Sequence, residues 1–205
     1  MSRVLLATRN VKKLAELQRI LGTRAQVVGL AEVVAFPEEP ETGATFEDNA
    51  VAKAEQAARE TGEITLADDS GLAVDAMNGM PGVLSARWSG QHGDDAANTT
   101  LLLAQMGDVP DGRRGAAFVC ALALVVPRES VRVVRGEWRG RILRQPRGSN
   151  GFGYDPVFVP EETDDSGDRR SAAQLLPSEK DSLSHRGRAL SLIMPELGVA
   201  LRRQR

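Results

Sequence analysis

The 205-residue sequence predicts an α/β fold, a single domain with a central mixed β-sheet flanked by helices. Short apolar runs alternate with helical apolar patterns in the first half of the chain, which is typical of parallel strands joined by helices. Two long predicted strands, 116–126 and 131–142, flank Pro127-Arg128-Glu129-Ser130 and predict an antiparallel hairpin. The length suffices for one well-buried core and is short for two ordinary domains. We therefore expect residues 1–205 to form one domain.

The N-terminal half shows strand, turn and helix signals in succession. Residues 3–7 predict a strand that leads through a polar turn into a helix ending before Gly22. A second strand is expected at 25–30, after which the Pro/Glu-rich residues 36–43 break regular structure. Thr45 and the acidic residue three positions later have the spacing of a capping pair, so a second helix should start there.

The C-terminal half is expected to contain a helix at 94–106, the hairpin, and a short strand at 157–159. The acidic residues 161–168 predict a mobile polar loop. A single last helix is expected from Ser178, capped by Asp181, with a buried stripe that includes Leu183, Leu190, Ile193 and Leu197.

Composition narrows the classes of function. A formal net charge of −2 provides no basic field for nucleic acid, so no polymer partner is expected. Cys120 is the single cysteine, which excludes an internal disulfide, and with His92 and His185 it gives too few ligands for a Cys/His zinc site. We expect no leader before the first predicted strand, and the longest apolar run, 116–127, is shorter than the ~20 residues that span a bilayer. We expect a cytoplasmic protein.

Adjacent acids follow the third predicted strand, 64–67. Asp68-Asp69-Ser70-Gly71 is a run of small polar residues, so we expect the strand to end there and to present a site at its carboxyl end. Asp68 and Asp69 could hold Mg²⁺, which prefers oxygen ligands, with Glu41 as a third acid. A solvated acidic turn is the alternative, because acid pairs are common on surfaces.

Cations and small polar residues lie near other element boundaries. Thr8, Asn10 and Lys13 occupy a strand-to-helix turn, where free backbone N–H groups and the helix dipole favour an anion such as phosphate. The turn lacks the glycines of a P-loop, and Lys13 alone could be an ordinary exposed lysine. Lys53, beside an Ala-rich helix stripe, either extends to solvent or meets a ligand.

Two later segments could bind a nucleobase. Phe152 lies between two glycines, which would allow its ring to stack on a base, and Asp155 would offer an acceptor to an N–H on the base edge. A turn with Phe152 as core filler is equally compatible. Lys180 and His185 would project roughly 140° apart on one straight helix, so both reach one small ligand only if the segment bends, for example at Gly187.

Taken together, the motifs resemble those of the inosine/xanthosine triphosphate pyrophosphatases, which remove deaminated purine nucleotides. They fall in the family's order from residue 8 to about 190. The motifs are Thr8-x-Asn10-x-x-Lys13, Glu41-Thr42-Gly43-x-Thr45-Phe46-x-x-Asn49-Ala50-x-x-Lys53-Ala54, Asp68-Asp69-Ser70-Gly71-Leu72, Ser85-Ala86-Arg87, Gly151-Phe152-Gly153-Tyr154-Asp155-Pro156 and Ser184-His185-Arg186-Gly187.

The resemblance implies a two-lobed fold with a cleft between the lobes, a homodimer, and hydrolysis of ITP, dITP or XTP to the monophosphate and pyrophosphate. It makes Asp69 the base that activates water and a ligand of Mg²⁺ together with Glu41. It also implies three sets of substrate-binding residues. The phosphates would be held by Thr8, Asn10, Lys13 and Lys53, and the nucleotide would be positioned by Ser70. The base would be bound by Phe152, Asp155, Lys180, His185 and Arg186, and the same motifs include Arg9, Gly153 and Tyr154 as substrate-binding residues.

The chain departs from the family pattern at Arg9, where glycine is frequent, and in the acidic insert 161–170. Three other functions stay open at this point. A nucleotide-binding sensor would use the same pocket without turnover. A haloacid-dehalogenase-type phosphatase would need Asp-x-Asp, which Asp68-Asp69-Ser70 does not supply. A pyrimidine-nucleotide pyrophosphatase of similar fold would differ in its base.

Overall fold

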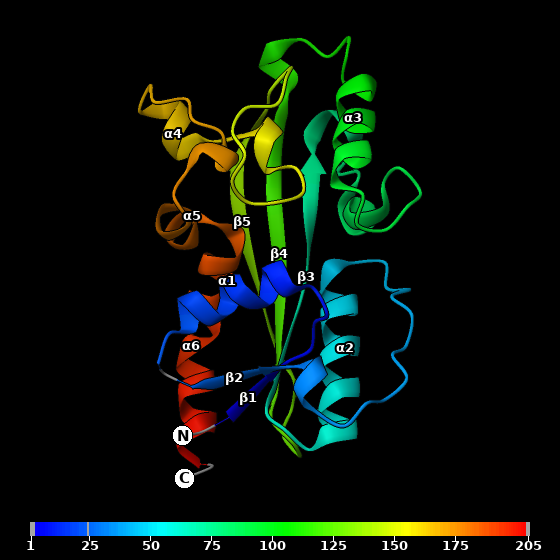
Figure 1. Cartoon of the computed structure of the whole chain (residues 1–205), viewed down its shortest axis with the longest axis vertical. Helices are drawn as coiled ribbons and strands as arrows, with labels where there is room; N and C mark the ends of the chain where they lie inside the picture. The colour runs from blue at the N-terminus through cyan, green and yellow to red at the C-terminus, as the bar shows by residue number, and fades with distance from the viewer. Residues whose placement is uncertain (1–2, 24, 204–205) are drawn as a thin grey trace. The chain divides into compact units, whose positions relative to one another are not determined.

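A computed structural model describes residues 3–23 and 25–203, which form six strands and six α-helices besides short 3₁₀ turns (Figure 1). The strands are β1 (Arg3–Leu6), β2 (Gln26–Gly29), β3 (Thr65–Val74), β4 (Gly115–Val125), β5 (Arg132–Ile142) and β6 (Phe158–Pro160). The helices are α1 (Val11–Leu21), α2 (Phe46–Thr61), α3 (Asp95–Gln105), α4 (Glu161–Asp165), α5 (Pro177–Leu183) and α6 (His185–Arg203).

The strands pair in the order β2-β1-β3-β4-β5-β6. β1 is parallel to β2 and β3, whereas β5 is antiparallel to β6. β4 and β5 are neighbours joined by residues 126–131, as expected of a hairpin. The predicted α/β fold with a mixed sheet flanked by helices is therefore confirmed.

The chain divides into two compact units. Unit 1 contains the described residues up to Asp69, then Cys120–Gly136, then those from His185 onward. Unit 2 contains Ser70–Val119 and Glu137–Ser184. Three of the four boundaries fall inside β3, β4 and β5, so each unit has its own part of these strands, and the fourth lies between α5 and α6.

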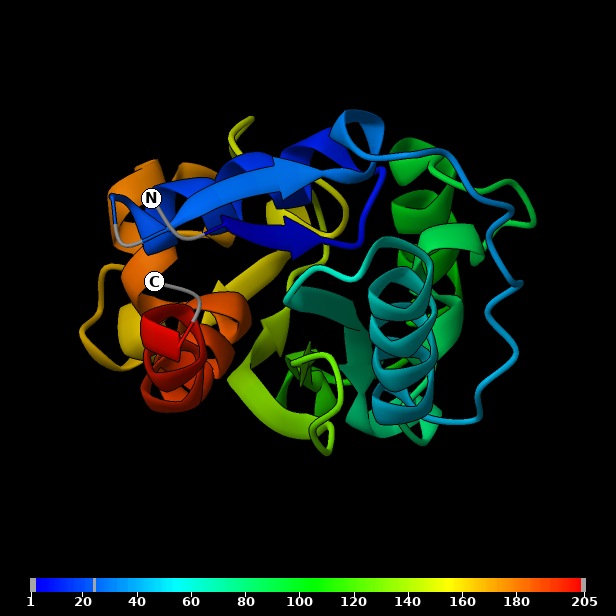
Figure 2. The ribbon, with the colours of Figure 1, turned by 90° about the horizontal axis from the view of Figure 1, so that it is seen from below.

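The core of unit 1 joins the two ends of the sequence. α1 contacts α6, and both contribute leucines to a cluster with strands β1, β3 and β4. Alternate residues of β4 enter this cluster because side chains of a strand point to its two faces in turn. α2 lies on the other side of β3 and β4 from α6 (Figure 2). The cluster includes Val4, Leu6, Leu17, Leu21, Leu66, Cys120, Leu122, Leu124, Leu190, Ile193 and Leu197.

Capping residues fix where the two N-terminal helices begin. The Asn10 side chain accepts hydrogen bonds from the backbone N–H groups of residues 12 and 13 at the start of α1. At α2 the predicted capping pair is confirmed, because the Thr45 hydroxyl and the Asp48 carboxylate each accept the backbone N–H of the other residue. α2 ends at Gly62 in the left-handed conformation.

Unit 2 is built around aromatic side chains. The ring of Phe158 lies 4.7 Å from that of Phe118, edge to face, and 5.5 Å from that of Trp138. Trp138 is fully buried, and its indole N–H donates to the carboxylate of Glu162 at 3.0 Å. The buried polar atom is thereby satisfied, so the aromatic core carries no penalty for it.

Three sequence-based expectations about element boundaries were wrong. They concern the end of β3, the acidic segment 161–168 and the last helix. β3 does not stop at residue 67 but continues through the acids to Val74, since their side chains find partners on both sides of the strand. The acidic segment expected to be a loop contains α4, where Asp164 forms two hydrogen bonds with Arg141 at 2.6 and 2.8 Å. Acids in a first helical turn are also favoured by the helix dipole.

The last predicted helix is in fact two helices. Ser184 is extended, with a ψ of 160°, and separates α5 from α6. Asp181 does not cap the first of them, because Glu179 accepts the backbone N–H of Leu176 at 2.7 Å. The predicted apolar stripe is divided accordingly, with Leu183 at the unit 2 core and the later residues in unit 1. Among the described residues, no helix combines the length and apolar character needed to cross a bilayer.

Close backbone approach between β5 and α6 in unit 1 gives a stability prediction. A Cβ on Gly136 would overlap the backbone carbonyl of His185 and the backbone nitrogen of Ala189. Backbone atoms cannot rotate away, so we expect Gly136→Ala to lower the free energy of unfolding by about 1–3 kcal/mol in urea titrations. Gly198→Ala is the control, because its Cβ would only touch Arg202 at 3.5 Å, and it should stabilise α6 by about 0.5–1 kcal/mol. Equal effects of the two substitutions would contradict the packing described.

Candidate functional site

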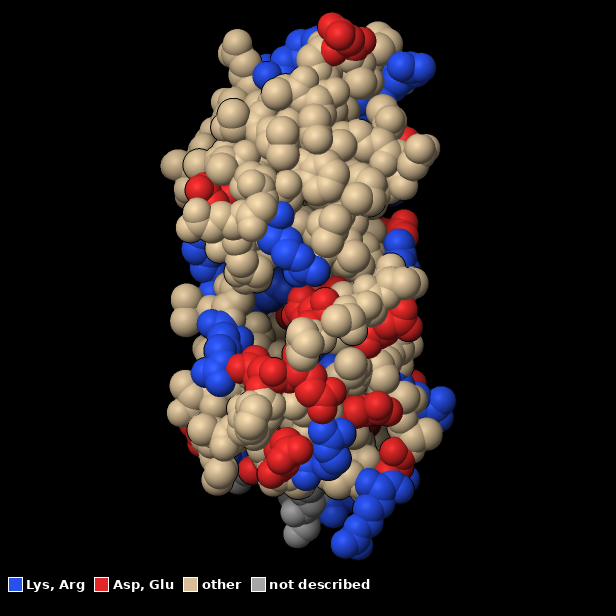
Figure 3. All heavy atoms as spheres, turned by 90° about the vertical axis from the view of Figure 1, so that its right-hand side faces the viewer, with Lys and Arg blue, Asp and Glu red and all other residues tan. Residues whose placement is uncertain are grey.

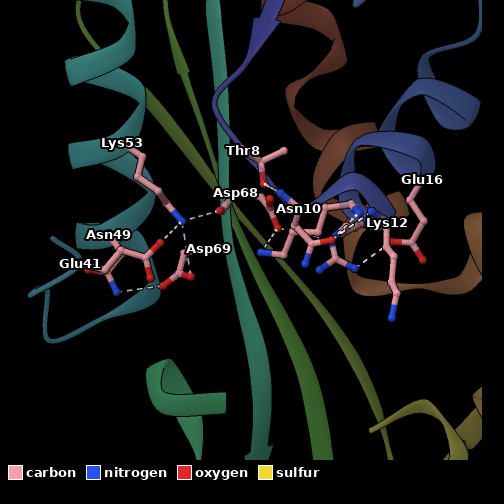
Figure 4. A network of polar contacts seen from close by, with 11 residues as sticks. Thr8, Asn10, Lys12, Glu16, Glu41, Asn49, Lys53, Asp68 and Asp69 are labelled. Atoms are coloured by element: carbon pink, nitrogen blue, oxygen red, sulfur yellow. Dashed lines mark hydrogen bonds and ion pairs between the residues drawn. The ribbon is translucent and has the colours of Figure 1, made fainter. Parts of the chain in front are cut away.

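The two adjacent acids of β3 point to opposite faces of the strand (Figure 4). This follows from the period of two in side-chain direction along a strand. Asp69 faces α2 and contacts Asn49 and Lys53. Asp68 faces α1 and contacts Lys13 and Arg186. The neighbouring carboxylates therefore belong to two different groups of partners.

On the α2 side, the amine of Lys53 gathers three oxygen groups. Its Nζ lies 2.9 Å from Oε1 of Glu41 and 3.6 Å from Oδ1 of Asp69, and it donates to the backbone carbonyl of Asp68 at 2.8 Å. Glu41 lies in the irregular segment before α2, whereas Asp69 is on β3. The lysine thus contacts acids from two separate parts of the chain, whereas the motifs predicted that these acids share a divalent ion and that Lys53 binds phosphate.

The electrostatics of this group depend on burial. Burial alone would lower the pKa of the Lys53 amine, but the charges of Asp69, Asp68 and Glu41 outweigh it and raise this pKa. Burial also raises the pKa of the Asp69 carboxyl, and Lys53 with the Asn49 hydrogen bond offsets only part of this effect. Lys53 therefore stays charged, while Asp69 is a better proton acceptor than an exposed aspartate.

On the other side of β3, a buried ion-pair network holds the Asp68 carboxylate. Lys13 Nζ lies 3.0 Å and Arg186 Nε 3.3 Å from its Oδ2, and Arg186 Nη1 also lies 2.8 Å from Glu16. The Arg186 side chain is 4% exposed and that of Asp68 0%. Burial tends to lower the pKa of Arg186, and the charges of Glu16 and Asp68 raise it overall. The Arg186 guanidinium therefore stays charged between its two acids.

The turn after β1 is organised by its own side chains. The Thr8 hydroxyl accepts the Asn10 backbone N–H at 3.1 Å, and Asn10 in turn caps α1. Arg9 forms an ion pair with Glu38 of the segment before α2. On the face formed by that segment and α2, acidic and basic side chains are interspersed (Figure 3), and Arg59 pairs there with Glu39 at 3.0 Å.

Unit 2 brings together several of the residues predicted to contact a base. Asp155 Oδ2 accepts the backbone N–H of Phe152 at 2.8 Å and the Lys180 amine at 2.6 Å. The same amine lies 5.0 Å from the centre of the Phe152 ring. Asp95 on α3 accepts the backbone N–H of Gly153 at 2.9 Å. The glycine-rich segment is therefore held by carboxylates on both sides.

The Tyr154 hydroxyl also anchors this segment, because it donates to the backbone carbonyl of Ser85 at 2.8 Å. Burial raises the pKa of Tyr154, so it remains a neutral donor. Ser70 follows the acids on β3 and is half-buried in unit 2. His185, the first residue of α6, is buried in unit 1, and Arg186 beside it contacts Asp68 and Glu16.

Sequence reasoning assigned no role to three residues that organise the site. They are Asn49, which contacts Asp69, Glu16, which contacts Arg186, and Asp95, which holds the glycine-rich segment. Asn49 lies four residues before Lys53 on the same helix face, and this spacing was a usable signal. Glu16 and Arg186 are 170 positions apart, so nothing local in the sequence indicates their contact.

The carboxylates of the site offer only part of the oxygen ligands that a hard divalent cation needs. No cluster of three or more His, Cys, Asp or Glu with metal-site geometry occurs within residues 3–23 and 25–203. Glu41 and Asp69 nevertheless share one amine, so two carboxylate groups face a common point. Mg²⁺ commonly binds one or two carboxylates and completes its shell with water and substrate phosphates. The carboxylate of Asp68 is not part of this pair, since it lies on the other face of the strand.

The buried network gives a second stability prediction. Replacing Arg186 by leucine would leave the carboxylates of Glu16 and Asp68 buried near each other without their shared cation. We expect a loss of about 3–5 kcal/mol in the free energy of unfolding, measured by urea denaturation. Arg203→Leu, which breaks the exposed Arg203–Glu129 pair, should change stability by less than about 1 kcal/mol. A loss below about 1 kcal/mol for Arg186→Leu would show that the network contributes little.

Comparisons with known proteins agree with the resemblance seen in the motifs. A dITP/XTP pyrophosphatase of Nocardia farcinica is 63% identical over 203 residues, covering 97% of this chain and 96% of the relative. A dITP/XTP pyrophosphatase of Mycobacterium tuberculosis (H37Rv) is 62% identical over 200 residues, covering 96% and 95% of the two chains.

Solved structures show the same relationship. A crystal structure of a nucleoside-triphosphatase / dITP/XTP pyrophosphatase from Mycobacterium abscessus has a TM-score of 0.76 at 60% identity, covering 94% of this chain and 99% of that one. The Ham1 protein of Staphylococcus aureus has a TM-score of 0.83 at 36% identity, covering 95% and 97%. The model of the Ham1 family matches residues 4–196. This chain belongs to the Ham1 family.

Proposed function

We propose that this protein hydrolyses non-standard purine nucleoside triphosphates, of the dITP, XTP and ITP type, to the monophosphate and pyrophosphate. The observation that carries the proposal is the convergence of Glu41 and Asp69 on the amine of Lys53. Relatives that are more than 60% identical over nearly their whole length are named dITP/XTP pyrophosphatases, which supports the substrate class. We further propose that the protein is a cytoplasmic homodimer, as the motif resemblance implies.

The proposal includes Mg²⁺, held by Glu41 and Asp69. The paired side chains of the site comprise four carboxylates, of Glu16, Glu41, Asp68 and Asp69, against three cations, of Lys13, Lys53 and Arg186. A triphosphate carries about four negative charges, so these residues alone would repel it. When bound, a divalent cation neutralises phosphate charge and polarises the phosphoryl group. With a divalent ion bound, the five positive charges of the site would exceed the four carboxylates by one.

Asp69 is the proposed general base. Its carboxyl accepts the proton of a water molecule that attacks the α phosphorus, and the bond from that phosphorus to the β-phosphate oxygen breaks to release pyrophosphate. The raised pKa of the Asp69 carboxyl favours this acceptance. The charges of Lys13 and Lys53 stabilise the negative charge that develops on the pyrophosphate. Asp68 has a different proposed task, since its contact at 3.0 Å sets the position of the Lys13 amine.

We propose that Phe152 stacks on the purine and that the Lys180 amine donates to the oxygen at position 6. Asp155 is engaged by Lys180 at 2.6 Å, so its proposed role is to orient that amine. An adenine amino group cannot accept the hydrogen bond, and leaving the buried amine short of a partner would cost about 1–3 kcal/mol. Discrimination against ATP of roughly 10- to 100-fold is expected from this contact alone.

A panel of substrates tests the proposed function. We expect pyrophosphate release from ITP, XTP and dITP to exceed that from ATP, GTP, dTTP and UTP at equal concentration, and to disappear when Mg²⁺ is removed with a chelator. Coupled detection of pyrophosphate, rather than phosphate, identifies the bond that is cleaved. Inactivity on all the purine triphosphates, or faster turnover of dTTP and UTP, would defeat the proposal.

Replacement of the base gives a second functional prediction. Asp69→Asn preserves the shape of the side chain but cannot accept the proton of water, so kcat for ITP should fall by about 10²–10⁴-fold. Binding of ITP, measured by calorimetry, should remain. Asp75→Asn is the control, because Asp75 forms an exposed ion pair with Arg139 in unit 2 and should leave kcat unchanged. Near-normal turnover by Asp69→Asn would assign the base to another residue.

A further inference from the structure

The side chain of Asn49 contacts both segments that carry the paired acids. Its Nδ2 donates to Asp69 Oδ2 at 2.9 Å, and its Oδ1 accepts the backbone N–H of Gly43 at 2.8 Å. Asn49 is 3% exposed and lies in the first turn of α2. One amide therefore links the Asp69 carboxylate to the segment that begins with Glu41.

The direction of this link is fixed by hydrogen-bond chemistry. A backbone N–H can only donate, so the Gly43 N–H requires the oxygen of the Asn49 amide to face it. The amide nitrogen must then face Asp69, which as a carboxylate can only accept. A flipped amide would place two donors together and two acceptors together, and both contacts would be lost. The orientation of the amide is thus determined by its two partners.

The fit around Gly43 shows that the segment is held closely. A Cβ at this position would lie 2.6 Å from Asn49 Oδ1 and 2.7 Å from Asp48 Cβ, so only glycine allows this approach. Because Oδ2 of Asp69 is engaged by Asn49, its Oδ1 is the oxygen that lies toward the Lys53 amine. The hydrogen bond from the amide therefore fixes the rotation of the Asp69 carboxylate, with Oδ1 toward the Lys53 amine.

We propose that Asn49 is a positioning residue for the reaction, one that sets the rotation of the Asp69 carboxylate and couples it to the placement of Glu41. This rests on the proposed function, in which Asp69 is the base. The side chain acts through Asp69 and does not itself touch the triphosphate. Its removal should therefore lower the rate of the chemical step more than it weakens substrate binding.

Two variants of Asn49 separate its two hydrogen bonds. Asn49→Leu removes both, whereas Asn49→Asp keeps an acceptor for Gly43 and loses the donor to Asp69. In both, we expect kcat with ITP and Mg²⁺ to fall by about 10- to 100-fold, with KM changed by less than about 3-fold. Hydrogen exchange adds a readout of geometry, because protection of the Gly43 amide should be lost in Asn49→Leu and kept in Asn49→Asp.

Gln56 provides the matched control. It lies seven residues further along the same face of α2, is 7% exposed, and binds the backbone of Pro37 and Glu39 at 2.7 and 3.1 Å. Gln56→Leu and Gln56→Glu make the same chemical changes without touching Asp69. We expect them to change stability to a similar degree, measured by thermal unfolding, while kcat stays within about 3-fold of the wild type.

The outcomes distinguish this inference from the proposed function. Equal losses of kcat in the Asn49 and Gln56 variants, or a higher KM with kcat intact in the Asn49 variants, would overturn the positioning role. If Asn49→Leu does not fold, Asn49→Asp carries the same comparison against Gln56→Glu. A wild-type protein inactive on every triphosphate would refute the proposed function, whereas unprotected Gly43 in the wild type would refute the Asn49 link by itself.

Discussion

The site depends on one half-buried amine, that of Lys53, which is surrounded by oxygen atoms. The amine of Lys53 contacts the carboxylates of Glu41 and Asp69 and the backbone carbonyl of Asp68, which are three groups from three different residues. Without that cation, two carboxylates near a buried strand would repel each other and favour neutral, protonated forms. Lys53 contacts both carboxylates, and its charge opposes the rise in the pKa of Asp69 that burial causes. Removing either acid would leave the amine under-paired, so the group acts as a unit.

The geometry of β3 divides the work between its two acids. Because consecutive side chains face opposite ways, Asp68 and Asp69 cannot serve one ion with both carboxylates. Asp68 instead anchors Lys13 and Arg186, so the cations on one face of the strand are arranged by the acid on that face. Asp69, on the other face, contacts Asn49 and Lys53 and is the proposed general base. A pair of identical neighbours thereby takes on two different tasks, each set by the helix it faces.

Several local features of the fold were predictable from the sequence. Asn10 and Thr45 mark the starts of α1 and α2. Each side chain accepts a backbone N–H group from the residue three positions later, which is typical of a polar residue placed directly before an apolar helical pattern. The combination of motifs predicted that Glu41 and Asp69 share one divalent ion and that Lys53 binds phosphate, whereas the structure places the Lys53 amine beside both acids. The motif around Lys53 alone left its position open, because a lysine beside an alanine-rich stripe is compatible with solvent exposure.

What could not be predicted depends on contacts between distant segments. β3 continues through its acids because Lys13, Arg186 and Asn49 supply partners, and no property of residues 68–71 alone reveals them. The break at Ser184 is similar, since the apolar pattern continues across it while α5 and α6 pack in different cores. Helical periodicity predicts which residues form an apolar face, but it does not predict whether that face packs in the core of unit 1 or of unit 2.

The most direct test of the central claim is to locate the divalent ion. Crystals of the protein with Mn²⁺ and a non-hydrolysable α,β-imido analogue of ITP would allow the ion to be placed from its anomalous scattering. We expect the ion to be coordinated by carboxylate oxygens of Glu41 and of Asp69 together with phosphate oxygens, and Lys53 to stay beside them. An ion bound by Asp68, or by neither Glu41 nor Asp69, would contradict the central claim.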